Sequence, residues 1–139
     1  MNQSAPKAVA VDTVELRIPA KAEFVSIARL AISAVASRLQ FSIEEIEDVK
    51  LAVSEALVNA IPRGGERADV ICESLPDGLR IRVRNFGGPV QPETLDVSRV
   101  DESAAGSLGV FLIRALMDEV SYESHENGTD LVMFKRLPG

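Results

Sequence analysis

The sequence predicts an α+β protein, a two-layer α/β sandwich in which a mixed, mostly antiparallel sheet carries three helices on one face. Three observations support this fold class. Apolar residues recur at helical spacing in some segments and alternate along others, which distinguishes helices from strands. Two tight turns join strands directly, and strands joined in this way pair antiparallel. The resulting order, β-α-α-β-β-loop-α-β-β, does not fit a doubly wound parallel sheet.

Composition limits the class of protein further. The 139 residues fit one core, and 46% hydrophobic with 26% charged residues is typical of a globular domain. The formal net charge of −6, without a Lys/Arg cluster longer than a pair, argues against direct binding of nucleic acid. No apolar run approaches the ~20 residues of a membrane helix. The single cysteine excludes an internal disulfide, so we expect a soluble cytoplasmic protein.

Two helices follow the first predicted strand. Alternating apolar residues predict a strand over residues 9–18, and residues 21–41 then show the spacing of an amphipathic helix. The stripe expected to face the core is Phe24, Ile27, Leu30, Ala31, Ala34, Val35 and Leu39. A second helix begins at Ser42, where Glu45 completes a capping-box pattern, and ends at Pro62. Its apolar stripe is Ile46, Val49, Val53, Leu57 and Ala60.

The second half of the chain predicts two hairpins and a third helix. The predicted segments are strands over 68–75 and 79–85, a helix over 108–120, and strands over 121–124 and 130–137. The turn sequences Pro76-Asp77-Gly78 and Asn127-Gly128 connect the two pairs of strands. Residues 86–107 show no clear periodicity, and a loop of that length inside a small domain is usually functional.

Five side chains have plain structural interpretations. Arg80, Arg82 and Arg84 alternate with apolar residues along one strand, so we expect them on a solvated face of the sheet. His125 lies in a turn without a partner nearby in the sequence and is expected at the surface. Cys72 lies within a strand and is expected to be a small buried hydrophobe rather than a nucleophile.

Glu55 and Asn59 are the first candidates for chemistry. At ~100° per residue they lie about 40° apart around the second helix and share a face. Oxygen ligands one turn apart can share a hard cation such as Mg²⁺, and a carboxylate can act as a base. The same spacing also fits a polar surface patch without a chemical role.

Glycines flank the long loop on both sides. The sequence Asn85-Phe86-Gly87-Gly88 follows a strand, and Gly106-Ser107-Leu108-Gly109 begins the third helix. Glycine near a helix N-terminus lets backbone N–H groups approach a phosphate, whose charge the helix dipole favours. Each motif alone also fits a loop hinge or a close packing contact. Their order, together with Glu55 and Asn59, favours a phosphate-binding site.

Three parts of the chain resemble a known family. They are residues 54–61 (SEALVNAI), residues 109–120 (GVFLIRALMDEV) and the ending over 127–137. They resemble the bacterial anti-sigma-factor serine/threonine kinases of the wider histidine-kinase-like ATPase superfamily. The resemblance covers residues 9–137, and the second segment is its most specific part. It implies the α/β sandwich of that superfamily, with ATP bound under a lid over about 89–105, and a homodimer. We therefore expect one domain over 9–139, preceded by a flexible arm over 1–8.

The resemblance also implies partners and roles for individual residues. Members of the family sequester an alternative sigma factor. They also use Mg-ATP to phosphorylate a serine or threonine of an anti-sigma-factor antagonist. By position, Asn59 would bind Mg²⁺ and Glu55 would be the catalytic base. The other cofactor-binding positions would be Asn85, Gly87, Gly88, Gly106, Ser107, Leu108 and Gly109.

The chain departs from the family pattern at four positions. Asn85 replaces an aspartate that accepts a hydrogen bond from the adenine amino group, and its amide oxygen can accept the same bond without the charge. Pro89 and Ser107 replace glycines, and Pro62 follows directly on the second helix. Two alternatives therefore remain open. One is a partner-binding module of the same fold with weak or no ATP binding, and the other is a switch kinase that activates a phosphatase.

Overall fold

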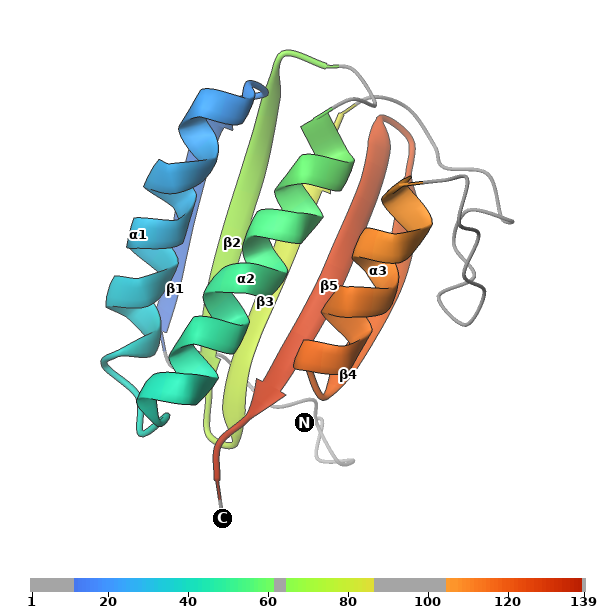
Figure 1. Cartoon of the computed structure of the whole chain (residues 1–139). Coiled ribbons are helices and arrows are strands. Elements are labelled where there is room, and N and C mark those ends of the chain that lie inside the picture. Colours follow the sequence, from blue (N-terminus) through green and yellow to red (C-terminus); the bar gives the residue numbers. More distant parts are fainter. Residues whose placement is uncertain (1–11, 62–64, 87–104, 139) are drawn as a thin grey trace, which may run out of the picture.

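A five-stranded sheet forms one layer of the structure, and three α-helices cover one of its faces (Figure 1). The computed structural model describes residues 12–61, 65–86 and 105–138, with side chains from residue 109 onward in the last range. The strands are β1 (Asp12–Pro19), β2 (Arg67–Leu75), β3 (Gly78–Asn85), β4 (Glu119–His125) and β5 (Gly128–Arg136). They lie in the order β1-β2-β3-β5-β4, and each neighbouring pair is antiparallel. The predicted fold class is confirmed, and the described sheet is antiparallel throughout.

The central helix, α2 (Ile43–Ala60), lies between α1 (Val25–Ala36) and α3 (Ala105–Leu116) in the helical layer (Figure 1). It begins with the predicted capping box. Ser42 Oγ accepts from the Glu45 N–H at 3.1 Å, and Glu45 Oε1 accepts from the Ser42 N–H at 2.8 Å. The buried members of its predicted stripe are Val49, Val53, Leu57 and Ala60. Their burial against the sheet fixes the rotation of α2 and therefore the direction of its polar side chains.

The first helix differs from its prediction in both length and buried face. A short 3₁₀ turn at Ala22–Phe24 precedes it, and it ends at Ala36 rather than at residue 41. Ile27 and Leu30, which helical spacing predicts on the core face, are 48% and 73% exposed. The buried residues are Ala28, Ile32 and Ala36. Because α1 is apolar on several sides, periodicity does not identify this face. The two alanines allow a closer approach to the core than larger side chains would.

The third helix ends earlier than predicted, and the chain turns into β4. Helix α3 ends at Leu116, and Val120, expected to be helical, lies in the strand. Strand β5 holds this junction, because Lys135 Nζ donates to the Leu116 carbonyl oxygen at 2.8 Å. The Asp118 N–H donates to the Phe134 carbonyl oxygen at 2.9 Å. These tertiary hydrogen bonds end the helix at a place where the sequence shows no break.

The face of the sheet opposite the helices carries paired charges. Its arginines, expected to be solvated, form the ion pairs Arg80–Glu73 at 2.7 Å, Arg82–Glu123 at 2.7 Å and Arg84–Asp130 at 2.8 Å. His125, expected at the surface, is instead half-buried, and its Nε2 lies 3.2 Å from Asp130 Oδ1. Neighbouring strands therefore neutralise most of the charge on this face.

Some predicted features lie outside the described residues. These are the arm over 1–8 and residues 89–104 of the expected lid. Within the described ranges, no helix combines the length and the apolar character that a membrane crossing requires.

Cys72 offers a direct test of the packing. It is 4% exposed in β2, as predicted, and burial, with a smaller contribution from Glu73, raises the pKa of its thiol to about 12. We expect the folded protein to resist a thiol-specific reagent such as DTNB at about pH 8, because the thiolate is the reacting species. One equivalent of thiol should react after unfolding in guanidinium chloride. Release of a full equivalent from the native protein at the rate of a small thiol would contradict this packing.

Candidate functional site

The candidate residues of α2 lie directly against α3. A β-carbon added to Gly109 would lie 3.0 Å from Asn59 Nδ2 and 3.3 Å from Glu55 Oε1. The two helices therefore approach closely because Gly109 has no side chain. Glu55 and Asn59 are both half-buried on the flank of α2 that faces α3. The structure thus brings together residues from two motifs that are some fifty positions apart in the sequence.

Asn59 carries a polar group that is buried without a partner. Its Nδ2 atom is inaccessible to solvent and has no hydrogen-bond partner among the described residues. Leaving such a donor unpaired costs about 1–3 kcal/mol. Because unpaired buried polar groups are rare in folded proteins, this amide marks a place where a ligand or ordered water belongs.

Asn85 and Thr129 form a second polar pair beneath α2. They are opposite one another in the β3–β5 ladder and are 6% and 1% exposed. Asn85 Nδ2 donates to the Thr129 carbonyl oxygen at 3.3 Å. A backbone carbonyl only accepts hydrogen bonds, so this contact fixes which end of the Asn85 amide is the nitrogen. The amide oxygen, an acceptor, therefore occupies the other end.

A narrow cavity connects these two groups. It lies between α2 and the sheet, with polar lining from Asn59, Asn85 and Thr129. Its remaining lining residues are Ala56, Ala60, Val83, Tyr122 and Leu131. Its volume of about 10 Å³ is room for one water molecule at most, so it marks a polar pocket at the edge of the candidate site and does not enclose a ligand.

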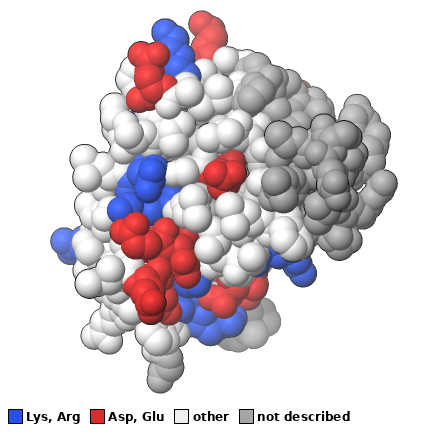
Figure 2. Space-filling model, in the orientation of Figure 1, with Lys and Arg blue, Asp and Glu red and all other residues white. Residues whose placement is uncertain are grey.

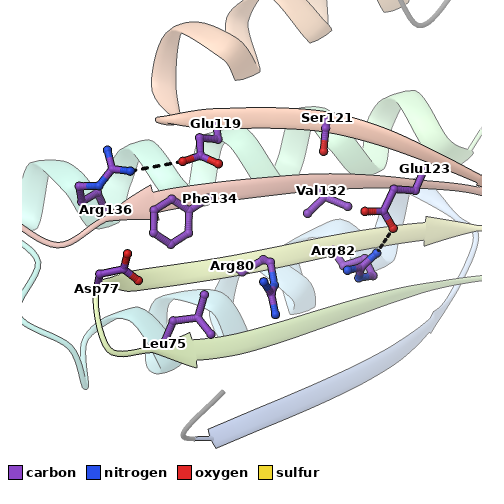
Figure 3. Close-up of a pocket in the computed structure, with 10 residues that line it drawn as sticks. All are labelled: Leu75, Asp77, Arg80, Arg82, Glu119, Ser121, Glu123, Val132, Phe134 and Arg136. Carbon is purple, nitrogen blue, oxygen red and sulfur yellow. Dashed lines mark hydrogen bonds and ion pairs between the residues drawn. The ribbon is translucent and has the colours of Figure 1, made fainter. Parts of the chain in front are cut away.

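A larger cavity of about 400 Å³ lies on the opposite face of the sheet (Figure 3). Leu75, Val132 and Phe134 contribute its apolar residues. Its arginines already have carboxylate partners, in the pairs Arg80–Glu73, Arg82–Glu123 and Arg136–Glu119. Because these arginines are paired, this cavity offers no unpaired arginine to an anionic ligand.

The other predicted site residues are described only in part. Gly87 and Gly88 lie outside the described residues, as does Pro89. Gly106, Ser107 and Leu108 belong to the first turn of α3, which begins at Ala105, three residues before its predicted start. The first four N–H groups of an α-helix have no acceptor within the helix, so this turn is suited to an anion.

Thr129 is the site residue that sequence reasoning missed. It follows the predicted Asn127-Gly128 turn, but nothing in the sequence shows that it lies opposite Asn85. Strands β3 and β5 are neighbours in the sheet although α3 and β4 separate them in the chain. Register between such strands depends on tertiary packing, and the turn motif was the only local signal.

The fold and this site define the class of protein. Residues 18–135 match the family described as histidine kinase-like ATPase domain, and the chain belongs to this family. Within it, the chain belongs to the group of RsbW serine-protein kinases. It is 41% identical to Serine-protein kinase RsbW of Bacillus pumilus (strain SAFR-032), over 91% of this chain and 87% of that protein. It is 36% identical to the protein of the same name from Bacillus subtilis (strain 168), over 92% and 88%. The family resemblance is therefore confirmed.

Solved structures show the same fold. A structure of the RsbU and RsbW domains of Rv1364c from Mycobacterium tuberculosis aligns with a TM-score of 0.69 at 17% identity, over 91% of this chain and 33% of that chain. The catalytic domain of histidine kinase ThkA aligns with a TM-score of 0.61 at 15% identity, over 91% and 98%. At these identities the likeness concerns the fold alone.

The residues present fit a magnesium nucleotide. Asn59 offers an amide oxygen of the kind that binds Mg²⁺ and a buried amide nitrogen without a partner among the described residues, Glu55 offers a carboxylate, and Gly109 leaves a space that a β-carbon would fill. Among the described residues, no group of three or more His, Cys, Asp and Glu side chains is placed to hold a metal. This is compatible with Mg²⁺, which commonly takes one or two protein oxygens and completes its shell with phosphates and water.

Gly109→Ala separates the stability of α3 from the integrity of the site. Alanine is favoured over glycine within a helix by about 1 kcal/mol, so the melting temperature should stay the same or rise. The new methyl group displaces the Glu55 and Asn59 side chains, which can move because they are flexible at their ends. We expect Mg-ATP binding, measured by calorimetry, to weaken about tenfold.

Ala115→Gly is the matched control for this variant. Ala115 is exposed near the end of the same helix. The change lowers helix propensity and should reduce the melting temperature while leaving the affinity unchanged. Wild-type affinity in Gly109→Ala would show that the close approach of the helices does not shape the site.

Proposed function

We propose that the chain is a Mg-ATP-dependent protein serine/threonine kinase that also acts as an anti-sigma factor. The observation that carries the proposal is the convergence of Glu55 and Asn59 with Gly109 beside the first turn of α3. The chain's membership of the RsbW group supports the reaction, because its relatives are serine-protein kinases.

Each group at the site has a role in this reaction. When bound, Mg-ATP supplies the phosphoryl group that is transferred. Asn59 would bind the metal through its side-chain oxygen, and the first-turn N–H groups of α3 would bind phosphate oxygens. Glu55 would accept the proton of the attacking serine or threonine hydroxyl. Positioning and charge stabilisation carry most of the catalysis in such reactions, so close packing around Gly109 matters.

Asn85 would recognise the adenine base. Its amide nitrogen is held by the Thr129 carbonyl, so its oxygen is the end that can accept a hydrogen bond from the exocyclic amine. An amide oxygen has two lone pairs and can accept this bond in addition to one within the protein. Gly87, Gly88, Gly106, Ser107 and Leu108 would complete the nucleotide-binding site, and residues 89–105 would form a lid over it.

The proposed partners are an alternative sigma factor and an anti-sigma-factor antagonist. The helical layer supports protein binding, because all three of its helices expose large apolar side chains. The most exposed of these are Leu30, Ile43, Val58 and Phe111. Figure 2 shows this face, on which acidic and basic groups gather at the lower left and again at the top, with mostly uncharged described residues between them. The proposal also includes a single domain over 9–139. Two copies of the chain would form a homodimer in the cytoplasm.

The second candidate is a partner-binding module that does not use ATP. The neutral Asn85 favours it, because the charge-assisted hydrogen bond that an aspartate would make to the base is absent. Calorimetric titration with Mg-ATP discriminates between the two functions. Heat that saturates at or below millimolar nucleotide supports the kinase, and no heat supports the binding module.

Asn59→Ala tests the magnesium ligand. We expect the variant to bind Mg-ATP about tenfold more weakly than the wild type, because one metal ligand is lost. In EDTA the two proteins should bind ATP equally, since Asn59 acts through the metal. A difference that persists without Mg²⁺ would assign Asn59 to another contact.

Glu55→Gln tests the catalytic base. Glutamine preserves the size of the side chain but removes the proton acceptor, so phosphoryl transfer to an antagonist protein should fall a hundredfold or more. Mg-ATP affinity should change little. Glu47→Gln is the control, because Glu47 lies two turns earlier on α2, is exposed, and pairs only with Lys50 among the described residues. Equal transfer rates in Glu55→Gln and the wild type would remove Glu55 from this role.

A further inference from the structure

Asp130 is a buried carboxylate surrounded by cations on the open face of the sheet. Its side chain is 4% exposed. Arg84 donates to both of its oxygens, from Nε at 2.8 Å and from Nη2 at 2.9 Å. Arg82 Nη1 donates to Oδ2 at 3.2 Å, and His125 Nε2 lies 3.2 Å from Oδ1. Burial raises the pKa of this carboxyl, but the hydrogen bonds and charges of Arg84 and Arg82 outweigh burial and lower it. The carboxylate therefore stays ionised and joins β3, β4 and β5.

This cluster lies back to back with the proposed nucleobase contact. In the β3–β5 ladder, Arg84 is opposite Asp130 and Asn85 is opposite Thr129, so the two pairs occupy successive positions. Successive side chains of a strand point to opposite faces of the sheet. The ion pair and the polar pair therefore depend on the same spacing between the same two strands. Asn85 is also the last residue of β3, where strands open most readily.

The spacing at this end of the ladder is tight. A β-carbon added to Gly128 would overlap the Asn85 carbonyl oxygen and lie 3.0 Å from Phe86 Cα. The Asn85–Thr129 hydrogen bond, at 3.3 Å, is already longer than the common range for N–H···O bonds. A separation that is larger by a few tenths of an ångström would break it. The Asn85 amide would then lose a contact that helps to set its orientation.

We infer that Asp130 is a positioning residue for base recognition. Its bidentate contact with Arg84 holds β5 against β3, and this spacing keeps the Asn85 amide fixed by the Thr129 carbonyl. With the amide fixed, the site presents an acceptor to the exocyclic amine of adenine. The inference rests on the proposed function, because it requires that the base lie beside Asn85.

The test compares two nucleotides in two variants. The nucleotides are ATP and purine riboside triphosphate, which lacks the exocyclic amine, each with Mg²⁺. The variants are Asp130→Asn and Glu73→Gln. Glu73 is the matched control because its ion pair with Arg80, at 2.7 Å, is on the same face but far along β3 from Asn85. The ratio of the two dissociation constants cancels any general loss of stability or of phosphate binding.

We expect the wild type and Glu73→Gln to prefer ATP to the same extent. In Asp130→Asn the preference should shrink at least fivefold, mainly through weaker binding of ATP. Arg84→Lys provides a second variant if Asp130→Asn does not fold. It keeps the charge but loses the bidentate geometry, so the same preference should shrink partly.

Each other outcome is decisive. An unchanged preference in both Asp130→Asn and Arg84→Lys would overturn the inference and leave Asp130 a purely structural residue. A wild type that binds both nucleotides equally would also overturn it, while leaving the proposed kinase function intact. A wild type that binds neither nucleotide would overturn the proposed function, and this inference with it.

Discussion

At Gly109, α3 approaches α2 so closely that an added β-carbon would press against the Glu55 and Asn59 side chains. Much of the candidate site follows from this contact. The buried stripe of α2 fixes its rotation over the sheet, which leaves Glu55 and Asn59 on the flank. The contact then places the first turn of α3, whose N–H groups have no acceptor within the helix, beside a carboxylate and an amide. A side chain at Gly109 would separate these groups while leaving the fold intact.

The sequence predicts well those helices and strands whose limits depend on a few neighbouring residues. The capping box at Ser42 and Glu45 fixes the beginning of α2, and helical spacing predicted four of its buried residues. The hairpin turn at Pro76 and Asp77 likewise sets the register of β2 and β3, in which Leu75 is opposite Gly78. In each of these cases the information lies within a few residues of the feature it determines.

The elements that were missed depend on contacts between distant segments. The end of α3 is set by hydrogen bonds from β5, including the one between Lys135 and the Leu116 carbonyl. Thr129 joins the site, and Asp130 lies behind it on the open face, only because β5 pairs with β3, and no local pattern specifies that pairing. The buried face of α1 was also missed, since a helix that is apolar on several sides offers no single stripe. Sequence therefore pointed to the candidate residues that meet between α2 and α3, but not to Thr129 on the sheet beneath them.

The distribution of charge explains how an acidic chain can hold a polyphosphate. The net charge is −6, yet the arginines of β3 are each paired with a carboxylate on the open face and none of them faces the cavity beneath α2. Under the proposed function, the helix dipole, the backbone N–H groups of α3 and a metal on Asn59 would attract the phosphates. These sources are short in range and fixed in direction, so they favour a correctly seated phosphate over anions in general. The paired arginines and carboxylates lie on the open face of the sheet, and the proposed phosphate-binding groups lie on the helical side. The ion pairs of the open face can therefore link β3 and β5 without competing for the phosphate.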